Sequence, residues 1–111
     1  MSTYLYTFRA PSGYAPSPDT FDAWSTWQLG LGARLKDRGN PAFAAAAVGA
    51  SAADTNLGGY SLIRAGSLDA AVALARGCPL LNHGGAVEIG ELVSHDERFD
   101  NWLDTMGTRH D

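Results

Sequence analysis

One carboxylate, Glu88, stands in the middle of an apolar segment near the end of the chain, between Val87 and Ile89. Neighbouring side chains of a β-strand point to opposite faces, so Glu88 must face away from both neighbours. If Val87 and Ile89 pack on helices, Glu88 points into a cleft on the other face of the sheet. Desolvation there would raise its pKa and suit it to act as acid, base or ligand anchor. The alternative is a salt bridge across a dimer interface, to Arg9 or Arg64.

A histidine, His83, precedes this segment and lies in a loop that ends in two glycines. Histidine exchanges protons near neutral pH. We therefore expect Glu88 and His83 to be the catalytic residues and to face one cleft. The alternative is that His83 only hydrogen-bonds the backbone or solvent.

Three aromatic residues and one hydroxyl are candidates for the walls of that cleft. Tyr60 and Ser61 lie in the central apolar segment of the chain, and Trp24 and Trp27 share one stripe of an amphipathic helix. We expect Tyr60, Ser61 and Trp24 to bind a ligand. The alternative for the two tryptophans is a place in the hydrophobic core.

Other chemistries lack the residues that they need. Cys78 is the single cysteine, so no internal disulfide forms, and a helix C-terminus beside it would raise the pKa of the thiol and disfavour a catalytic thiolate. The histidines have no metal-ligand spacing, and the chain has no Gly-x-Gly-x-x-Gly or P-loop motif. We therefore expect neither a metal nor a cofactor.

The composition is typical of one soluble domain, with 45% hydrophobic and 18% charged residues in a chain of 111. No apolar run approaches the roughly 20 residues that a membrane span needs. The N-terminus resembles no signal peptide. We expect a cytoplasmic protein with no membrane partner.

The charge is concentrated at the end of the chain. Residues 1–94 carry seven acidic and six basic side chains, a net charge of −1, whereas 95–111 carry five acidic and two basic ones, a net charge of −3. Without a basic patch, nucleic-acid binding has no electrostatic basis. We expect one domain over 1–94 and an acidic tail over 95–111, in which Phe99, Trp102, Leu103 and Met106 are spaced as in a short docking helix.

Apolar spacing and turn residues predict six regular elements. In chain order they are a strand over 3–8, a helix capped by Asp19 or Thr20 and ending near 38, a strand over 43–50, a strand over 56–64, a helix over 67–77 and a strand over 86–93. The segment 43–50 is alanine-rich, which favours a helix, and only the topology makes it a strand. Gly77 is expected to end the second helix in a left-handed conformation.

This order predicts an α+β, ferredoxin-like fold, with the elements strand, helix, strand, strand, helix, strand. Both helices must then cover one face of the sheet and leave the other face open. An open apolar face needs a partner, and the simplest partner is a second copy of the chain.

From residue 57 onward the chain resembles the YCII-related family, whose relatives include proteins named for an Asp-Gly-Pro-Phe motif. The residues that carry the resemblance are Leu57-Gly58-Gly59-Tyr60-Ser61-Leu62-Ile63, Leu68-Asp69-Ala70-Ala71, Gly77-Cys78-Pro79, Gly84-Gly85 and Val87-Glu88-Ile89. The resemblance implies a dimeric α/β barrel in which two sheets face each other across a cleft. The chain lacks the Asp-Gly-Pro-Phe motif, with residues 51–56 in its place. It also lacks the helix histidine of some relatives, because no histidine precedes His83.

The sequence thus predicts a homodimer that binds a small organic ligand in a cleft between the sheets, as a ligand-binding protein or as a cofactor-free lyase, isomerase or hydrolase. The alternative is a non-enzymatic binding or protein-interaction module, because no complete set of nucleophile, base and orienting residue can be named. Haem binding is a third option, since related dimeric barrels hold haem and His83 is a potential ligand.

Overall fold

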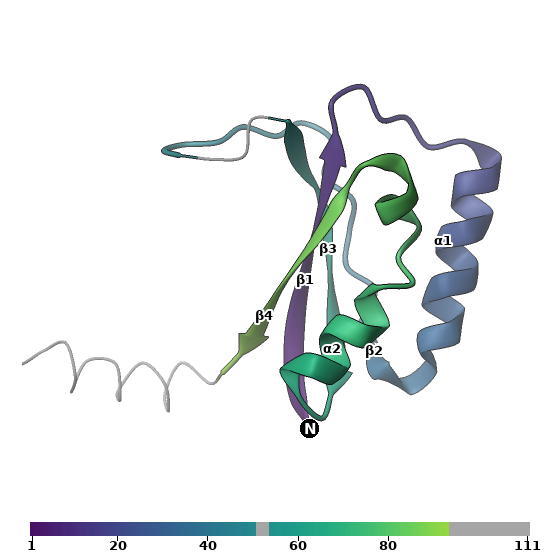
Figure 1. Ribbon diagram of the computed structural model, residues 1–111, viewed down its shortest axis with the longest axis vertical. Helices are drawn as coiled ribbons and strands as arrows, with labels where there is room; N and C mark the ends of the chain where they lie inside the picture. Colours follow the sequence, from purple (N-terminus) through teal and green to yellow (C-terminus); the bar gives the residue numbers. More distant parts are fainter. Residues whose placement is uncertain (51–53, 94–111) are drawn as a thin grey trace, which may run out of the picture.

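The structure is a computed structural model of the chain, and it describes residues 1–50 and 54–93 (Figure 1). The described elements are β1 (Ser2–Pro11), α1 (Pro18–Leu31), the 3₁₀ helix η1 (Gly32–Arg34), β2 (Leu35–Asp37), β3 (Thr55–Ala65), α2 (Leu68–Ala75), the 3₁₀ helix η2 (Pro79–His83) and β4 (Ala86–Leu92). The predicted docking helix in the tail lies outside the described residues, as do residues 51–53.

The four strands form one antiparallel sheet in the order β2-β3-β1-β4. Both helices lie on the same side of this sheet (Figure 1). Each helix joins two strands that have a third strand between them, which is the ferredoxin-like arrangement. The predicted α+β fold class is confirmed.

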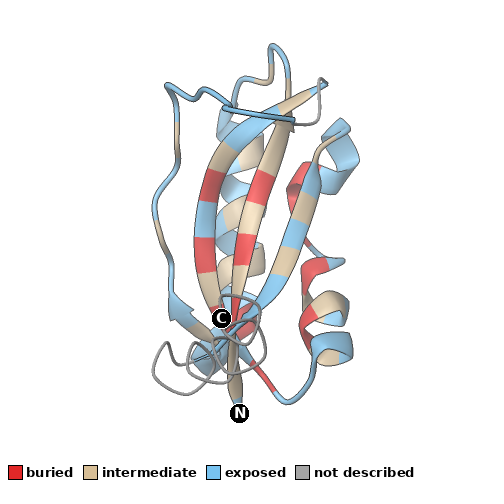
Figure 2. Cartoon of the chain, turned by 90° about the vertical axis from the view of Figure 1, so that its left-hand side faces the viewer, coloured by how far each residue is buried: buried red, intermediate tan, exposed pale blue. Residues whose placement is uncertain are grey.

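The central strand β1 owes its orientation to a strict alternation of side chains. Tyr4, Tyr6 and Phe8 are buried at 2%, 0% and 6% exposure and face the helices, whereas Leu5 and Thr7 between them are half-buried and face the other way. Figure 2 shows the same alternation along the two central strands. The face that carries Leu5 is therefore the open face of the sheet.

The core is an aromatic cluster between β1 and the two helices. The ring of Tyr6 stacks on Trp27 with centroids 6.4 Å apart, and Phe8 meets Trp24 edge to face at 5.0 Å. The Tyr6 hydroxyl donates to the carbonyl oxygen of Ala71, and Trp27 Nε1 donates to the carbonyl oxygen of Leu74 at 3.1 Å. These two bonds attach α2 to the sheet and to α1, and they satisfy the buried donors of Tyr6 and Trp27.

The first helix differs from the prediction at both ends. Its N-cap is Ser17, whose hydroxyl accepts from the Thr20 amide at 3.3 Å, so neither Asp19 nor Thr20 is the cap. The helix ends at Leu31, seven residues before the predicted end near 38, because Gly32 has φ +58° and ψ −129°. That conformation is open to glycine and interrupts the helical hydrogen-bond pattern.

The strand predicted over 43–50 is wrong, because the second strand is Leu35–Asp37. Leu35 pairs with Ile63 and packs against the core, whereas residues 43–50 form no regular element. Phe43 is 85% exposed and Val48 is fully exposed. Alanines offer too little apolar area to bury this segment against the sheet.

The second helix confirms its predicted start and corrects its end. The Ser67 hydroxyl accepts from the Ala70 amide at 3.1 Å. The C-cap is Arg76 in the right-handed helical conformation, and Gly77 has no positive φ, so the predicted left-handed end is wrong. Gly77 matters for packing, because a Cβ there would lie 3.0 Å from Cδ1 of Trp27.

Among the described helices, none is long and apolar enough to cross a membrane.

Candidate functional site

A cavity of about 360 Å³ opens between α1, residues 56–61 in the first part of β3 and the segment 38–43. It lies on the helix-covered side of the sheet. Its lining is mainly aromatic and apolar, with a few polar side chains. The aromatic lining residues are Phe8, Tyr14, Phe21, Trp24, Phe43 and Tyr60, and the polar ones include Gln28, Arg38, Asn40, Asn56 and Ser61.

The floor of the cavity is a bulge in β3. The β1–β3 register shifts between Phe8 and Arg9, and Gly58 is the extra residue on the β3 side. A Cβ at Gly59, which has φ +146°, would lie 2.8 Å from the carbonyl oxygen of Asn40. The absence of a side chain at Gly59 therefore lets the segment 38–42 lie directly across the strand.

The segment 38–42 forms one rim of the cavity and is fixed to β3 by hydrogen bonds. The Tyr60 amide donates to the carbonyl of Asn40 at 3.2 Å, and the Ala42 amide donates to the carbonyl of Gly58 at 3.0 Å. The Ser61 hydroxyl, on a residue only 1% exposed, donates to the carbonyl of Arg38 at 2.6 Å. This rim is thus held at three points along its length.

The opposite wall comes from α1 and the proline-rich loop that precedes it. Trp24 faces the sheet and Phe21 is largely exposed at the mouth. The ring of Tyr14 lines the cavity, and its buried hydroxyl has no hydrogen-bond partner among the residues that the structure describes. An unpaired buried hydroxyl is costly, so a ligand group that accepts a hydrogen bond from Tyr14 would remove that cost.

The three predicted ligand-binding residues, Trp24, Tyr60 and Ser61, all line this cavity. Trp24 also packs edge to face on Phe8, so it serves the core as well, which was the alternative. Their role in binding remains a prediction. Sequence reasoning missed Tyr14 and Arg38, for which proline and glycine neighbours at a loop were the only available signals.

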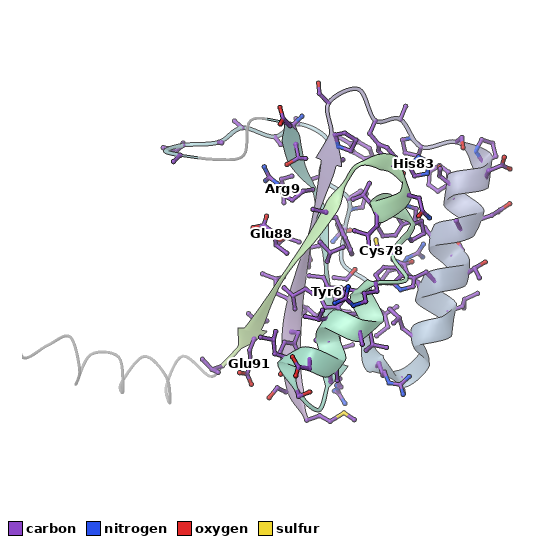
Figure 3. The ribbon with its side chains drawn as sticks, viewed as in Figure 1. Tyr6, Arg9, Cys78, His83, Glu88 and Glu91 are labelled. Carbon is purple, nitrogen blue, oxygen red and sulfur yellow. The ribbon has the colours of Figure 1, made fainter. Side chains whose placement is uncertain are left out.

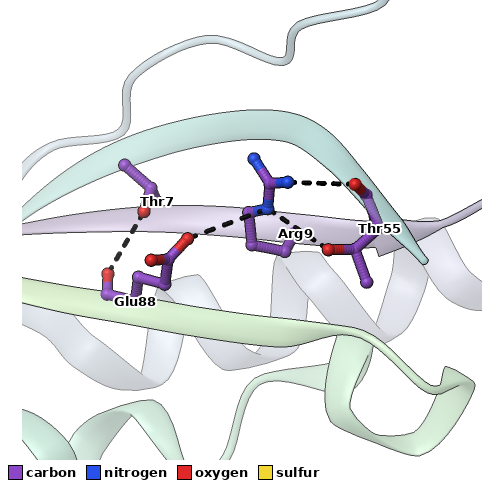
Figure 4. A network of polar contacts seen from close by, with 4 residues as sticks. All are labelled: Thr7, Arg9, Thr55 and Glu88. Carbon is purple, nitrogen blue, oxygen red and sulfur yellow. Dashed lines mark hydrogen bonds and ion pairs between the residues drawn. The ribbon is translucent and has the colours of Figure 1, made fainter. Parts of the chain in front are cut away.

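Glu88 lies on the other side of the sheet, as the alternation in β4 predicted. Its side chain is 69% exposed, and its Oε1 is 3.7 Å from Nε of Arg9 (Figure 3). Arg9 also donates to the side chain and the carbonyl of Thr55, at 3.3 and 2.9 Å (Figure 4). The salt bridge that was the alternative for Glu88 exists, but within one chain.

His83 is not on that side. It ends η2, is exposed, and its ring meets Tyr14 with centroids 5.6 Å apart. Figure 3 shows His83 beside α1 and Glu88 pointing away from the helices. The prediction that Glu88 and His83 face one cleft is therefore wrong. His83 is in η2, which packs against α1 on the helix-covered side of the sheet, whereas the Glu88 side chain lies on the open face.

Cys78 is a core residue, exposed at only 2%. Burial raises the pKa of its thiol to about 11, so the thiol stays protonated at neutral pH. The expectation that no catalytic thiolate forms here agrees with this environment, although burial, not a helix end, is the main cause. Within residues 1–50 and 54–93, no three His, Cys, Asp or Glu side chains are grouped to hold a metal ion.

The fold and site together define an α+β protein of ferredoxin-like topology with an aromatic cavity under its first helix. No family model matches the chain, and no curated protein matches it. Among solved structures, it is similar to a 5-chloro-2-hydroxyhydroquinone dehydrochlorinase from Burkholderia phenoliruptrix AC1100, in complex with 2,5-dihydroxybenzoquinone.

The two chains are 19% identical, the match covers 86% of this chain and 97% of that chain, and the TM-score is 0.60. At this identity the similarity shows a shared fold. Membership of the YCII-related family stays a prediction.

Proposed function

We propose that the protein is a homodimer that binds a small organic molecule in the cavity between α1 and the sheet. The observation that carries the proposal is the cavity itself. Its volume of about 360 Å³ lies within the usual range for small-molecule sites, and an aromatic lining with a few polar groups is their usual chemistry.

This location differs from the cleft between two sheets that the sequence predicted. A cleft of that kind needs a second copy of the chain, and the open face with Leu5 and Glu88 is where it would form. The helix-covered cavity is complete within one chain. We therefore assign the binding role to the cavity and the assembly role to the open face.

The similar structure, a dehydrochlorinase in complex with 2,5-dihydroxybenzoquinone, supports a small organic ligand for this fold. It does not carry a reaction to this chain. Among the described lining residues there is no carboxylate, imidazole or thiol. The hydroxyls of Tyr14, Tyr60 and Ser61 remain as groups able to move a proton, so binding is the primary proposal and cofactor-free catalysis remains secondary.

The test is to fill the cavity. Ala42 lines it and Ala33 is exposed on η1 away from it, so Ala42→Trp and Ala33→Trp make a matched pair. Small aromatic compounds are first selected because they quench the tryptophan fluorescence of the wild type. Their affinities for the three proteins are then measured by calorimetry. We expect at least tenfold weaker binding to Ala42→Trp than to the wild type, and unchanged binding to Ala33→Trp. Equal binding to all three proteins would show that these compounds bind elsewhere and would refute the cavity as the site.

A further inference from the structure

The charge on the cavity lining has one sign. Arg38 is the one charged side chain among the described lining residues, and none of them is acidic. The whole chain, by contrast, has a net charge of −4. In an acidic protein, a cavity without a carboxylate and with an arginine at its rim is a local positive site.

None of the nearby described carboxylates forms an ion pair with Arg38, so its guanidinium is available to a ligand. The carboxylate of the preceding residue, Asp37, accepts from the Gly39 amide at 2.9 Å, which turns it toward the backbone. The ion pair within the described part of the chain joins Arg9 to Glu88 on the other face of the sheet. Arg38 has no ion-pair partner among these residues, and it is an exposed residue of the cavity lining.

The backbone that bears Arg38 is held in place. Its carbonyl oxygen accepts the short hydrogen bond from Ser61, whose side chain is buried on the inner face of β3. Gly39 has φ +74°, and a Cβ there would collide with the carbonyl oxygen of Tyr60. The close contact at Gly39 and the bond from Ser61 fix the point from which the guanidinium extends.

The walls favour a flat molecule. Rings of Phe8, Tyr14, Phe21 and Trp24 line the side of the cavity formed by β1, α1 and the loop between them. Aromatic rings gain additional energy from stacked and edge-to-face contacts with another ring, beyond the area that they bury. Arginine in turn matches the planar, two-oxygen geometry of a carboxylate.

We propose that the cavity binds a flat aromatic anion, with its ring against the aromatic wall and its negatively charged oxygen at Arg38. This inference rests on the proposed binding function and adds the chemical class of the molecule. Arg38 is the residue that selects the anion.

Calorimetry with paired probes tests the charge. 2-Naphthoate and 2-naphthamide share a ring and differ in charge, so the wild type should bind the carboxylate about tenfold or more tightly, the difference expected for a charge-assisted hydrogen bond. Arg38→Ala should remove that preference and leave the amide unaffected. Arg34→Ala, an equal charge change on η1 outside the lining, is the control and should retain the preference.

A second pair tests the shape. Benzoate and cyclohexanecarboxylate carry the same charged group, and the flat benzoate should bind more tightly. Raising the salt concentration should weaken the carboxylates more than the amide, because exposed charges are screened.

The outcomes separate the two claims. If 2-naphthamide binds as tightly as 2-naphthoate, or if Arg34→Ala loses the preference as fully as Arg38→Ala, the anion inference is wrong and the binding function stands. If none of the four probes binds the wild type, the inference is wrong, and a negative result with the wider set of neutral aromatic compounds would then refute the binding function as well.

Discussion

Tyr6 and Cys78 are two weak acids buried in one core. The Tyr6 side chain is fully buried and Cys78 nearly so, and each is surrounded mainly by apolar groups. Burial raises the pKa of Tyr6 to about 12, with a smaller contribution from Cys78, and it raises the pKa of Cys78 to about 11. Both groups therefore stay neutral in the folded protein at pH values where they would ionise in the unfolded chain.

This difference predicts alkaline instability. A pKa raised by folding adds stability that is fully present below the unfolded value and is lost as the pH rises through the folded value. The loss should begin near pH 9 for Cys78 and pH 10 for Tyr6, and continue to about 11 and 12. Urea midpoints measured between pH 7 and 11 should fall above pH 9.

The control for this prediction is Tyr6→Phe. It removes the hydrogen bond to Ala71, so it should be less stable than the wild type at pH 7, but it should lose less stability on the alkaline side. A wild-type urea midpoint that stays level up to pH 11 would contradict the prediction.

At the scale of single residues, the sequence was better at selecting candidate site residues than at predicting which of them lie together. Alternation in a strand correctly oriented Glu88, and apolar context led to Trp24, Tyr60 and Ser61 at the cavity. Arg38 was missed because its place depends on a bulge in another strand, at Gly58 and Gly59, whose geometry no local pattern encodes.

At the scale of single elements, two glycines near the end of α1 have opposite conformational requirements. Gly30 lies within the helix, whereas Gly32 has φ +58° and ψ −129° just after it. Neither would place an added Cβ within 4 Å of another group. Any difference between substitutions there must therefore come from the backbone.

We expect Gly30→Ala to stabilise the protein by up to about 1 kcal/mol, because alanine favours the helix. Gly32→Ala should destabilise it by about 1–3 kcal/mol, because a residue with a Cβ is strained in this conformation. Urea unfolding of the two variants measures both effects. If Gly32→Ala were neutral, the predicted end near 38, with α1 continuing through this position, would regain support.

Most elements could be predicted because each has a strong local signal. Alternation predicted β1 and β4, and the Ser67 cap predicted α2. The second strand could not be predicted, because Leu35–Asp37 spans three residues, too few for a period to appear. The alanine-rich segment after Pro41 was predicted as a strand only because the topology needed one there. Its side chains bury too little apolar area to stabilise a strand in the sheet.

At the scale of the whole molecule, the sheet has one covered and one open face. The helices lie on the covered face (Figure 1). The cavity lies on the same side of the sheet, beneath α1. On the open face Leu5 and Leu62 are cross-strand partners, and Leu92 is exposed at 44% near the end of β4. We expect another molecule to cover this apolar group beside the Arg9–Glu88 pair.

We expect that molecule to be a second copy of the chain. Genuine interfaces bury more than about 1,000 Å² in total, an area that requires much of the open face. Because Leu62 points away from the core, Leu62→Glu should leave the monomer folded and place a charge inside the interface. Leu29, which is 81% exposed on α1, provides the matched control Leu29→Glu.

Light scattering at micromolar concentration is the measurement. The wild type and Leu29→Glu should have twice the chain mass of 11.7 kDa, and Leu62→Glu should have the single mass. Truncation after Ser94 should keep the doubled mass, because the sheet faces are expected to supply the contact. A wild-type mass near 11.7 kDa would refute the dimer, and a doubled mass for Leu62→Glu would place the interface somewhere other than the open face of the sheet.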